Sequence, residues 1–138
     1  MVFVDVESPY SGQMVDGVDE VHRNIRYARA CVRDSLLRGE IPYASHLFYT
    51  QPGILDDNNL TERQLGMEAG KRIIEGLEAV TVAYTDLGIS KGMKWGIKKA
   101  IDSGRSVEYR SLGDKWEEEF TEHEGDHSHC EVWGVKLT

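Results

Sequence analysis

Cysteine and long apolar runs are the scarcest features of this chain. It has 2 cysteines in 138 residues, Cys31 and Cys130, which are far apart and form no motif. No disulfide framework is therefore expected, and this favours an intracellular protein. There is no charged and then apolar leader and no long apolar run, so we expect neither secretion nor a membrane span.

Positive charge is also in short supply. Lys and Arg number 16 against 24 Asp and Glu, which gives a net charge of -8 at pH 7. We expect so acidic a chain to bind neither nucleic acid nor an anionic membrane broadly, although a local pocket for one phosphate is compatible with it. The composition, 40% hydrophobic and 29% charged, is typical of one globular domain with a core. We expect a cytoplasmic protein without a cofactor.

The most informative stretch runs from Ala79 to Tyr109. Residues 79–84 are apolar and β-branched, as in a buried strand, and residues 85–88 form a loop. A helix then starts at Ser90, whose hydroxyl suits an N-cap. Its apolar face carries Met93, Ile97, Ala100 and Ile101. Residues 107–109 start another strand and complete a βαβ unit, whose helix N-terminus directs free amides beyond the sheet.

The rest of the chain alternates strands and helices in the same way. The expected elements are a strand at 2–7, a helix from 19 to Gly39, a short strand at 41–44 and a long loop at 45–59. Another helix starts at Thr61, where Gln64 completes a capping box. The alternation predicts an α/β fold, a flavodoxin-like or Rossmann-like three-layer sandwich with a mostly parallel sheet.

Such folds bind ligands beyond the carboxyl ends of their strands, where the strand order reverses. If the first and third strands are central neighbours, loops 8–17 and 85–90 meet there. In the first strand Asp5 and Glu7 share one face, and we expect Glu7 to reach solvent at the strand end. After residue 112 the alternation stops. We therefore divide the chain into a domain at 1–112 and an acidic extension at 113–138, with an edge strand near residues 132–135.

The helix over 61–77 carries two distinct rows of residues. Its apolar stripe, which we expect to face the core, is formed by Leu65, Ala69, Ile73 and Leu77. Gly66 and Gly70 lie on a neighbouring row and permit the close approach of another backbone. That backbone belongs either to the same chain or to a second subunit.

A family resemblance rests on the order and spacing of several short motifs. They are Ser8-Pro9-Tyr10-Ser11-Gly12, Asn24, residues 42–47, residues 62–67 and Ile89-Ser90-Lys91-Gly92-Met93, followed by Ala100, Gly104 and Val107. Over residues 2–112 the chain thereby resembles the nucleoside 2-deoxyribosyltransferase-like superfamily, in particular its small, often phage-encoded branch. The resemblance implies a flavodoxin-like sheet, a nucleoside or nucleotide ligand, and a homo-oligomer whose pockets are completed by neighbouring subunits. Active members cleave or exchange the N-glycosidic bond through a glutamate nucleophile that a first-loop tyrosine positions.

The resemblance implies a candidate site when it is carried over residue by residue. Tyr10 matches the first-loop aromatic position, Asp86 lies near an acid of active members, and Ser90 matches a residue near the phosphate in nucleotide hydrolases. The candidate ligand-binding residues are Ser8, Pro9, Tyr10, Ser11, Gly12, His46, Gly88, Ser90, Gly92 and Met93. The nucleophile belongs three residues after the Gly-Met pair, and Gly96 stands there. Glycine offers no carboxylate for attack on an anomeric carbon.

Several other residues have more than one interpretation. Glu7, at the end of the first strand, is the best candidate for a relocated nucleophile. His46 fits either a ligand contact or a hydrogen-bonded structural histidine, and Trp95 fits packing, a subunit contact or base stacking. The metal-ligand residue types of the tail are His123, His127, His129 and Cys130. Their spacing matches no standard zinc site, and we expect no metal there.

Three functions remain open on this reasoning. The favoured one is a protein that holds a nucleotide or nucleotide-derived signal without cleaving it, as a phage protein that sequesters a host immune signal would. The second is an active deoxyribosyltransferase or nucleotide N-glycosidase, with Tyr10, Asp86 and Glu7 as candidate catalytic residues. The third is a non-catalytic interaction scaffold. Gly96 favours the first function over the second, and the sequence alone predicts that Gly96→Glu fits the helix and gains slow base release.

Overall fold

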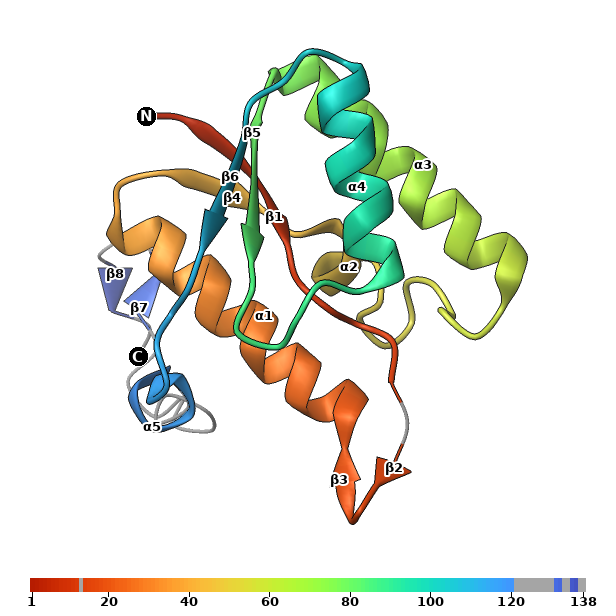
Figure 1. Cartoon of the computed structure of the whole chain (residues 1–138), viewed down its shortest axis with the longest axis vertical. Coiled ribbons are helices and arrows are strands. Elements are labelled where there is room, and N and C mark those ends of the chain that lie inside the picture. The colour runs from red at the N-terminus through yellow and green to blue at the C-terminus, as the bar shows by residue number, and fades with distance from the viewer. Residues whose placement is uncertain (13, 121–130, 133–134, 137–138) are drawn as a thin grey trace.

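The computed structural model describes residues 1–12, 14–120, 131–132 and 135–136. Its strands are β1 (Phe3–Glu7), β2 (Met14–Val15), β3 (Val18–Asp19), β4 (Ile41–Tyr43), β5 (Val80–Tyr84), β6 (Val107–Arg110), β7 (Glu131–Val132) and β8 (Val135–Lys136). Its helices are α1 (Glu20–Leu37), α2 (Ser45–Phe48), α3 (Leu60–Leu77), α4 (Lys91–Asp102) and α5 (Trp116–Phe120). Figure 1 shows their arrangement.

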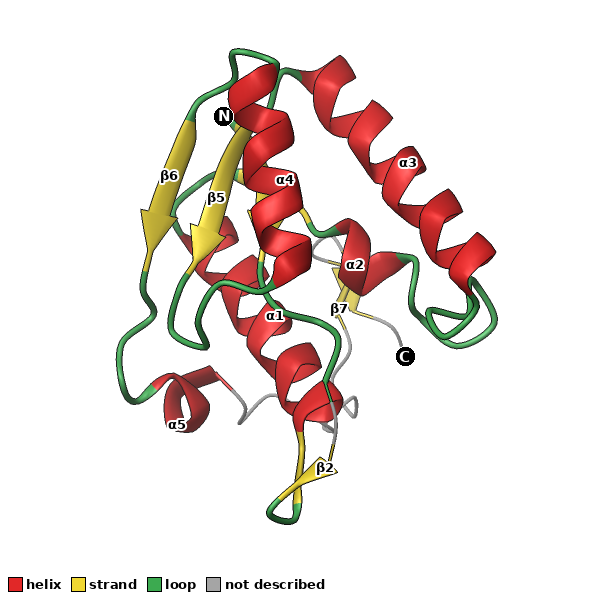
Figure 2. Cartoon of the chain, turned by 45° about the vertical axis from the view of Figure 1, so that its right-hand side comes forward, coloured by secondary structure: helices red, strands yellow, loops and turns green. Residues whose placement is uncertain are grey.

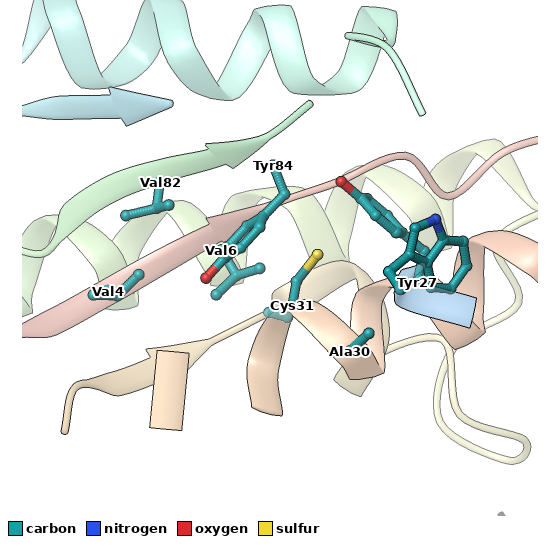
Figure 3. Packing of buried hydrophobic residues seen from close by; sticks show 9 residues of the cluster. Val4, Val6, Tyr27, Ala30, Cys31, Val82 and Tyr84 are labelled. Carbon is teal, nitrogen blue, oxygen red and sulfur yellow. The ribbon is translucent and has the colours of Figure 1, made fainter. Parts of the chain in front are cut away.

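The central sheet has the strand order β4-β1-β5-β6, and all three neighbouring pairs are parallel. Helices α1, α3 and α4 connect its successive strands along the chain. The sheet separates α1 from α4, which lie against opposite faces (Figure 3). The molecule is therefore an α/β three-layer sandwich of the Rossmann-like or flavodoxin-like type, and this prediction is confirmed. The first and third predicted strands, β1 and β5, are central neighbours as the site argument required.

Side chains of the two central strands alternate between the two faces of the sheet. Val4, Val6, Val82 and Tyr84 join Tyr27 and Cys31 of α1 in the main core cluster (Figure 3). The intervening residue Ala83 packs with Met93 and Ile97 of α4 on the other face. Because successive side chains of a strand point to opposite faces, Asp5 and Glu7 share this second face. Two acids are thereby placed on the α4 side of the sheet.

Helix α5 closes the core from beyond the predicted domain boundary. The ring of Trp116 is 4% exposed and packs edge-on against Tyr27, with 5.0 Å between the ring centroids. Trp116 lies within the predicted acidic extension, but its side chain belongs to the main hydrophobic cluster.

Four local expectations differ from the structure. The N-cap of α3 is Asn59, whose side chain accepts from the amide of Glu62, so the expected Thr61–Gln64 capping box is wrong. The expected loop at 45–59 contains α2, and the expected loop at 8–17 leads into the β2–β3 hairpin. The expected edge strand is wrong, because the described strands there, β7 and β8, pair with each other in a separate two-stranded sheet.

The orientation of α3 is the largest correction to the predicted fold. Leu65, Ile73 and Leu77 are 62%, 38% and 39% exposed, so most of the expected core stripe faces outward. Gly66 and Gly70 are buried instead. A Cβ at Gly70 would lie 2.6 Å from the Cβ of Ser45, so α3 approaches α2 through its glycines. Close packing of α3 against α2 therefore determines which face of α3 is buried, although the hydrophobic pattern predicts a different face. Ile101, which we expected on the apolar face of α4, is also 62% exposed.

In the parts of the chain that the structure describes, no helix combines the length and apolar character needed to cross a membrane.

Candidate functional site

A pocket of about 470 Å³ lies at the carboxyl end of β1, between α2, α3 and α4. Helix α3 runs beside α4 at the outer margin of this layer (Figure 2). The pocket has the volume typical of small-ligand sites. Its lining residues are Asp5, Glu7, Ser8, Tyr10, Ser11, Ser45, His46, Tyr49, Thr50, Leu55, Asp57, Glu62, Arg63, Gly66, Met67, Gly70, Lys71, Ile74, Ser90, Lys91, Gly92, Met93, Trp95, Gly96, Lys99 and Arg105.

The amino end of α4 forms one side of the pocket. Ser90 is the N-cap, as predicted, and its Oγ accepts from the amide of Met93 at 3.2 Å. Lys91, Gly92 and Met93 follow it along the lining. The first turn of a helix leaves amides without intrahelical partners and carries partial positive charge, so this side of the pocket suits an anionic group.

Hydrogen bonds hold the loop after β1 in place. Ser8 Oγ lies 2.8 Å from His46 Nε2, which joins this loop to α2. Burial lowers the pKa of His46 to about 4, so its ring is neutral near pH 7. Asn24 of α1 donates from Nδ2 to the carbonyl oxygen of Tyr10 at 3.0 Å. These contacts fix the loop that presents Tyr10 to the pocket. His46 is therefore hydrogen-bonded, as its structural interpretation requires, and it also lines the pocket.

Glu7 occupies the space beside Gly96. A Cβ built on Gly96 would overlap Oε1 of Glu7 and would lie 2.6 Å from its Cδ and 3.0 Å from its Oε2. A side chain at position 96 would therefore displace the Glu7 carboxyl, which is the far end of a flexible side chain. The helix position that lacks an acid thus has one beside it from the neighbouring strand. Gly96→Glu fits the helix only if Glu7 moves out of this space, and its gain of activity stays a prediction.

Asp5 lies behind Glu7 on the same face of β1. Its carboxyl is 7% exposed and accepts a hydrogen bond from Thr81 Oγ1 at 3.0 Å. Thr81 Oγ1 in turn accepts from Arg105 Nη1 at 3.0 Å. Burial raises the pKa of Asp5, although Thr81 and the charge of Arg105 oppose this shift. Burial also raises the pKa of Glu7 well above its usual range, and the charge of Asp5 adds to the effect.

The pocket is more cationic than the protein as a whole. It has five Lys and Arg side chains against four Asp and Glu, whereas the whole chain has 16 against 24. Lys99 Nζ lies 5.7 Å from the ring centroid of Trp95, so cation and aromatic surface occur together. This concentration of positive charge on an acidic protein favours an anionic ligand over a neutral or cationic one.

The structure brings most of the predicted site residues together. Those that line the pocket are Glu7, Ser8, Tyr10, Ser11, His46, Ser90, Gly92 and Met93. Three predicted ligand-binding residues are not in the lining. Pro9 is buried beside it, Gly12 packs against Glu20 of α1, and Gly88 supplies a turn with φ of 84°.

Asp86, a predicted catalytic residue, does not line the pocket. Its carboxylate accepts hydrogen bonds from Tyr27 Oη, Ser111 Oγ and the amides of Leu112 and Gly113. Burial opposes ionisation of Asp86, but these hydrogen bonds outweigh it and lower its pKa. These hydrogen bonds link α1 and the loop after β5 to the segment after β6, so Asp86 has a structural role.

The residues of α3 that line the pocket were not predicted from the sequence. Arg63, Met67, Lys71 and Ile74 line the pocket, although the expected inward stripe lay on another row. The paired glycines on α3 were the available signal, since they mark the flank that approaches α2. The metal-ligand residue types of the tail lie outside the described residues. Within the described residues, no group of three or more His, Cys, Asp or Glu side chains is placed to hold a metal ion.

The fold and this pocket define an α/β sandwich protein with a pocket at the carboxyl end of a central parallel strand. Its family is given by a model described as a domain of unknown function (DUF7768), which matches residues 2–110. The chain belongs to that family. No curated protein and no solved structure matches the chain.

Proposed function

We propose that the pocket binds a nucleoside, a nucleotide or a nucleotide-derived small molecule. The observation that carries this proposal is the meeting of aromatic rings and cations in one pocket at the carboxyl end of β1. Tyr10, Tyr49 and Trp95 supply surfaces on which a base stacks, and Lys91 and Lys99 supply charge for a phosphate. A cytoplasmic location, in the host cell for a phage-encoded chain, belongs to the same proposal. A protein that binds without turnover would sequester its ligand, for example a nucleotide-derived signal.

Calorimetric titration with a panel of nucleosides and nucleoside mono- and diphosphates tests this proposal. Ser90→Asp is expected to weaken phosphate-bearing ligands by about tenfold, because it adds negative charge where the free helix amides attract an anion. Aspartate is as good an N-cap as serine, so α4 is retained. Ser103→Asp, at the other end of α4, adds the same charge away from the pocket and is the matched control. Unchanged affinity in Ser90→Asp would place the phosphate elsewhere, and no binding to any of the panel would refute the function.

Cleavage of the N-glycosidic bond is a second candidate, and the position of Glu7 favours it. A carboxyl reaches the space beside Gly96 from β1, and Tyr10 lines the same pocket. In this reaction Glu7 first loses its proton to water. Its carboxylate then attacks the anomeric carbon, the carbon–nitrogen bond breaks, and the base leaves with its electron pair and takes up a proton from water. Water then hydrolyses the glycosyl ester and restores the carboxylate.

Incubation with 2′-deoxynucleosides and their 5′-monophosphates, followed by chromatography, tests cleavage directly. If the unmodified protein releases free base, Glu7→Gln is expected to slow the release by at least about a thousandfold, because an amide cannot form the ester. Tyr10→Phe is expected to slow it less. If the unmodified protein binds nucleotides and releases no base, the binding function stands and the cleavage function falls.

We also propose that the protein is a homo-oligomer that uses the outward row of α3. Leu65, Ala69, Ile73 and Leu77 recur every four residues, which places them along one line of the helix surface. Light scattering at high micromolar concentration is expected to give a dimer or larger assembly. Leu65→Glu combined with Ile73→Glu should yield monomers, whereas Leu36→Glu, at an exposed leucine of α1, should not. A monomeric unmodified protein would refute the proposal.

A further inference from the structure

Two carboxyls, from Asp5 and Glu7, lie close together on one face of β1 at the base of the pocket. Asp5 is 7% exposed, and the carboxyl of Glu7 is pressed against Gly96 of α4. Among the described residues, neither acid has a Lys, Arg or His nitrogen within 4.0 Å. Two buried carboxylates without a paired cation would repel each other and lose hydration, so such a pair retains a proton.

The neighbours of the pair decide which acid carries that proton. Asp5 accepts from Thr81, and the single hydrogen of that hydroxyl is directed at Asp5 because Arg105 donates to the same oxygen. Arg105 also donates from Nη1 to the carbonyl of Ala79. This chain of donors stabilises Asp5 as the charged member. The same contacts leave Glu7, at the carboxyl end of β1, as the neutral one.

We propose that Asp5 and Glu7 hold one proton between them, which the neutral carboxyl of Glu7 donates to Asp5 in the ligand-free protein and turns toward an acceptor of the ligand on binding. Glu7 is then a specificity-determining residue that selects a hydrogen-bond acceptor, such as a hydroxyl oxygen, a carbonyl or an anionic oxygen. A charged Glu7 would repel an anion, whereas the neutral form admits it. This inference rests on the proposed function and adds the protonation state in which the pocket binds.

The direction of the pKa shifts agrees with this geometry, and so does the sign of the expected pH dependence. The pKa of Glu7 lies well above its usual range, because of burial and then the charge of Asp5. Affinity is therefore high below the pKa of Glu7 and falls as the pH rises through it. The titratable or charged groups that line the pocket with Glu7 are Asp5, Tyr10, His46, Tyr49, Asp57, Glu62, Arg63, Lys71, Lys91, Lys99 and Arg105. His46 has a pKa of about 4, and a phosphate group ionises for the second time at about pH 6, so only the part of the pH dependence that Glu7→Gln removes reports on the acid pair.

Calorimetry from about pH 5.5 to about pH 8.5 with 2′-deoxyadenosine 5′-monophosphate and with inorganic phosphate tests the inference. Affinity of the unmodified protein is expected to fall at least tenfold once Glu7 ionises. Glu7→Gln keeps a neutral donor at every pH, so its affinity should follow only the second ionisation of the phosphate, at about pH 6. Asp5→Asn removes the charge that raises the pKa of Glu7, so the fall should occur at lower pH. A merely structural role for either acid would change affinity without moving the pH profile.

Carbon-13 NMR titration of the carboxyl groups in the ligand-free protein gives an independent readout. Glu7→Gln assigns the Glu7 signal, which is expected to titrate well above the ordinary carboxyl range. If both acids titrate in the ordinary carboxyl range, or if the pH profile of the unmodified protein matches that of Glu7→Gln, the shared proton is refuted and nucleotide binding stands. If the probes do not bind but Glu7 titrates well above the ordinary carboxyl range, the proton assignment stands and the choice of nucleotide ligand fails.

Discussion

Gly96→Ala is expected to lower the free energy of unfolding by about 1–3 kcal/mol, the usual cost of overpacking a filled site. Alanine is the better helix former by about 1 kcal/mol, so helix propensity alone predicts the opposite sign. Overlap decides the outcome, because the new Cβ falls on the carboxyl of Glu7. Urea denaturation measures the change, and any ligand affinity measured for the unmodified protein should fall with it as Glu7 is displaced.

The contact itself is isolated by two further variants. Gly92→Ala is the matched control on the same helix, since its Cβ would meet only Ser90 Oγ at 3.9 Å. It is expected to be neutral or to stabilise by up to about 1 kcal/mol. Glu7→Ala should relieve the penalty of Gly96→Ala, so the double variant should be more stable than the two single effects predict. If Gly96→Ala stabilises as Gly92→Ala does, the carboxyl of Glu7 does not lie beside Gly96.

Asp86→Ala is expected to lower the free energy of unfolding by about 2–4 kcal/mol, since it leaves two partly buried and two exposed donors without their acceptor. The donors are the hydroxyls of Tyr27 and Ser111 and the amides of Leu112 and Gly113. Asp114→Ala, at an exposed acid nearby, removes the same charge and should change stability by less than about 0.5 kcal/mol.

The pH dependence of this effect has a defined sign. Hydrogen bonds lower the folded-state pKa of Asp86 against the effect of burial, so its ionised form is favoured in the folded protein. The stability it contributes is present above the unfolded pKa of about 3.9 and is lost as the pH falls through the folded pKa. Thermal unfolding of the unmodified protein and of Asp86→Ala should therefore converge below about pH 4. If the two proteins are equally stable at neutral pH, or if Asp86→Ala loses nucleotide affinity at unchanged stability, Asp86 belongs to the site after all.

Local sequence patterns predicted the parallel sheet and its helices because each pattern lies within a single segment of the chain. The apolar run at β5, the Ser90 cap and the amphipathic face of α4 around Met93 all depend on neighbours a few residues away. The existence of α3 was equally visible. Its orientation was not, because the fit of Gly70 to Ser45 of α2 outweighs the hydrophobic row that includes Leu65.

The site was predictable only where its residues follow a strand or start a helix. Ser8, Tyr10 and Ser90 do so, and they meet because β1 and β5 are neighbours. The relation between Glu7 and Gly96 joins residues 89 positions apart on different elements. In the sequence, Gly96 indicates only that the helix lacks the carboxylate that the family resemblance implies. Only the packed structure shows that the glycine makes space for another one.

The packing of Trp116 on Tyr27 bears on where this protein can be cut. The family match ends at residue 110, and a fragment ending there would retain all four strands of the main sheet. It would nevertheless uncover the ring of Tyr27 and remove the Leu112 and Gly113 amides that Asp86 holds. The smallest self-sufficient folding unit therefore extends through α5, and expression boundaries drawn from sequence similarity alone would divide a core.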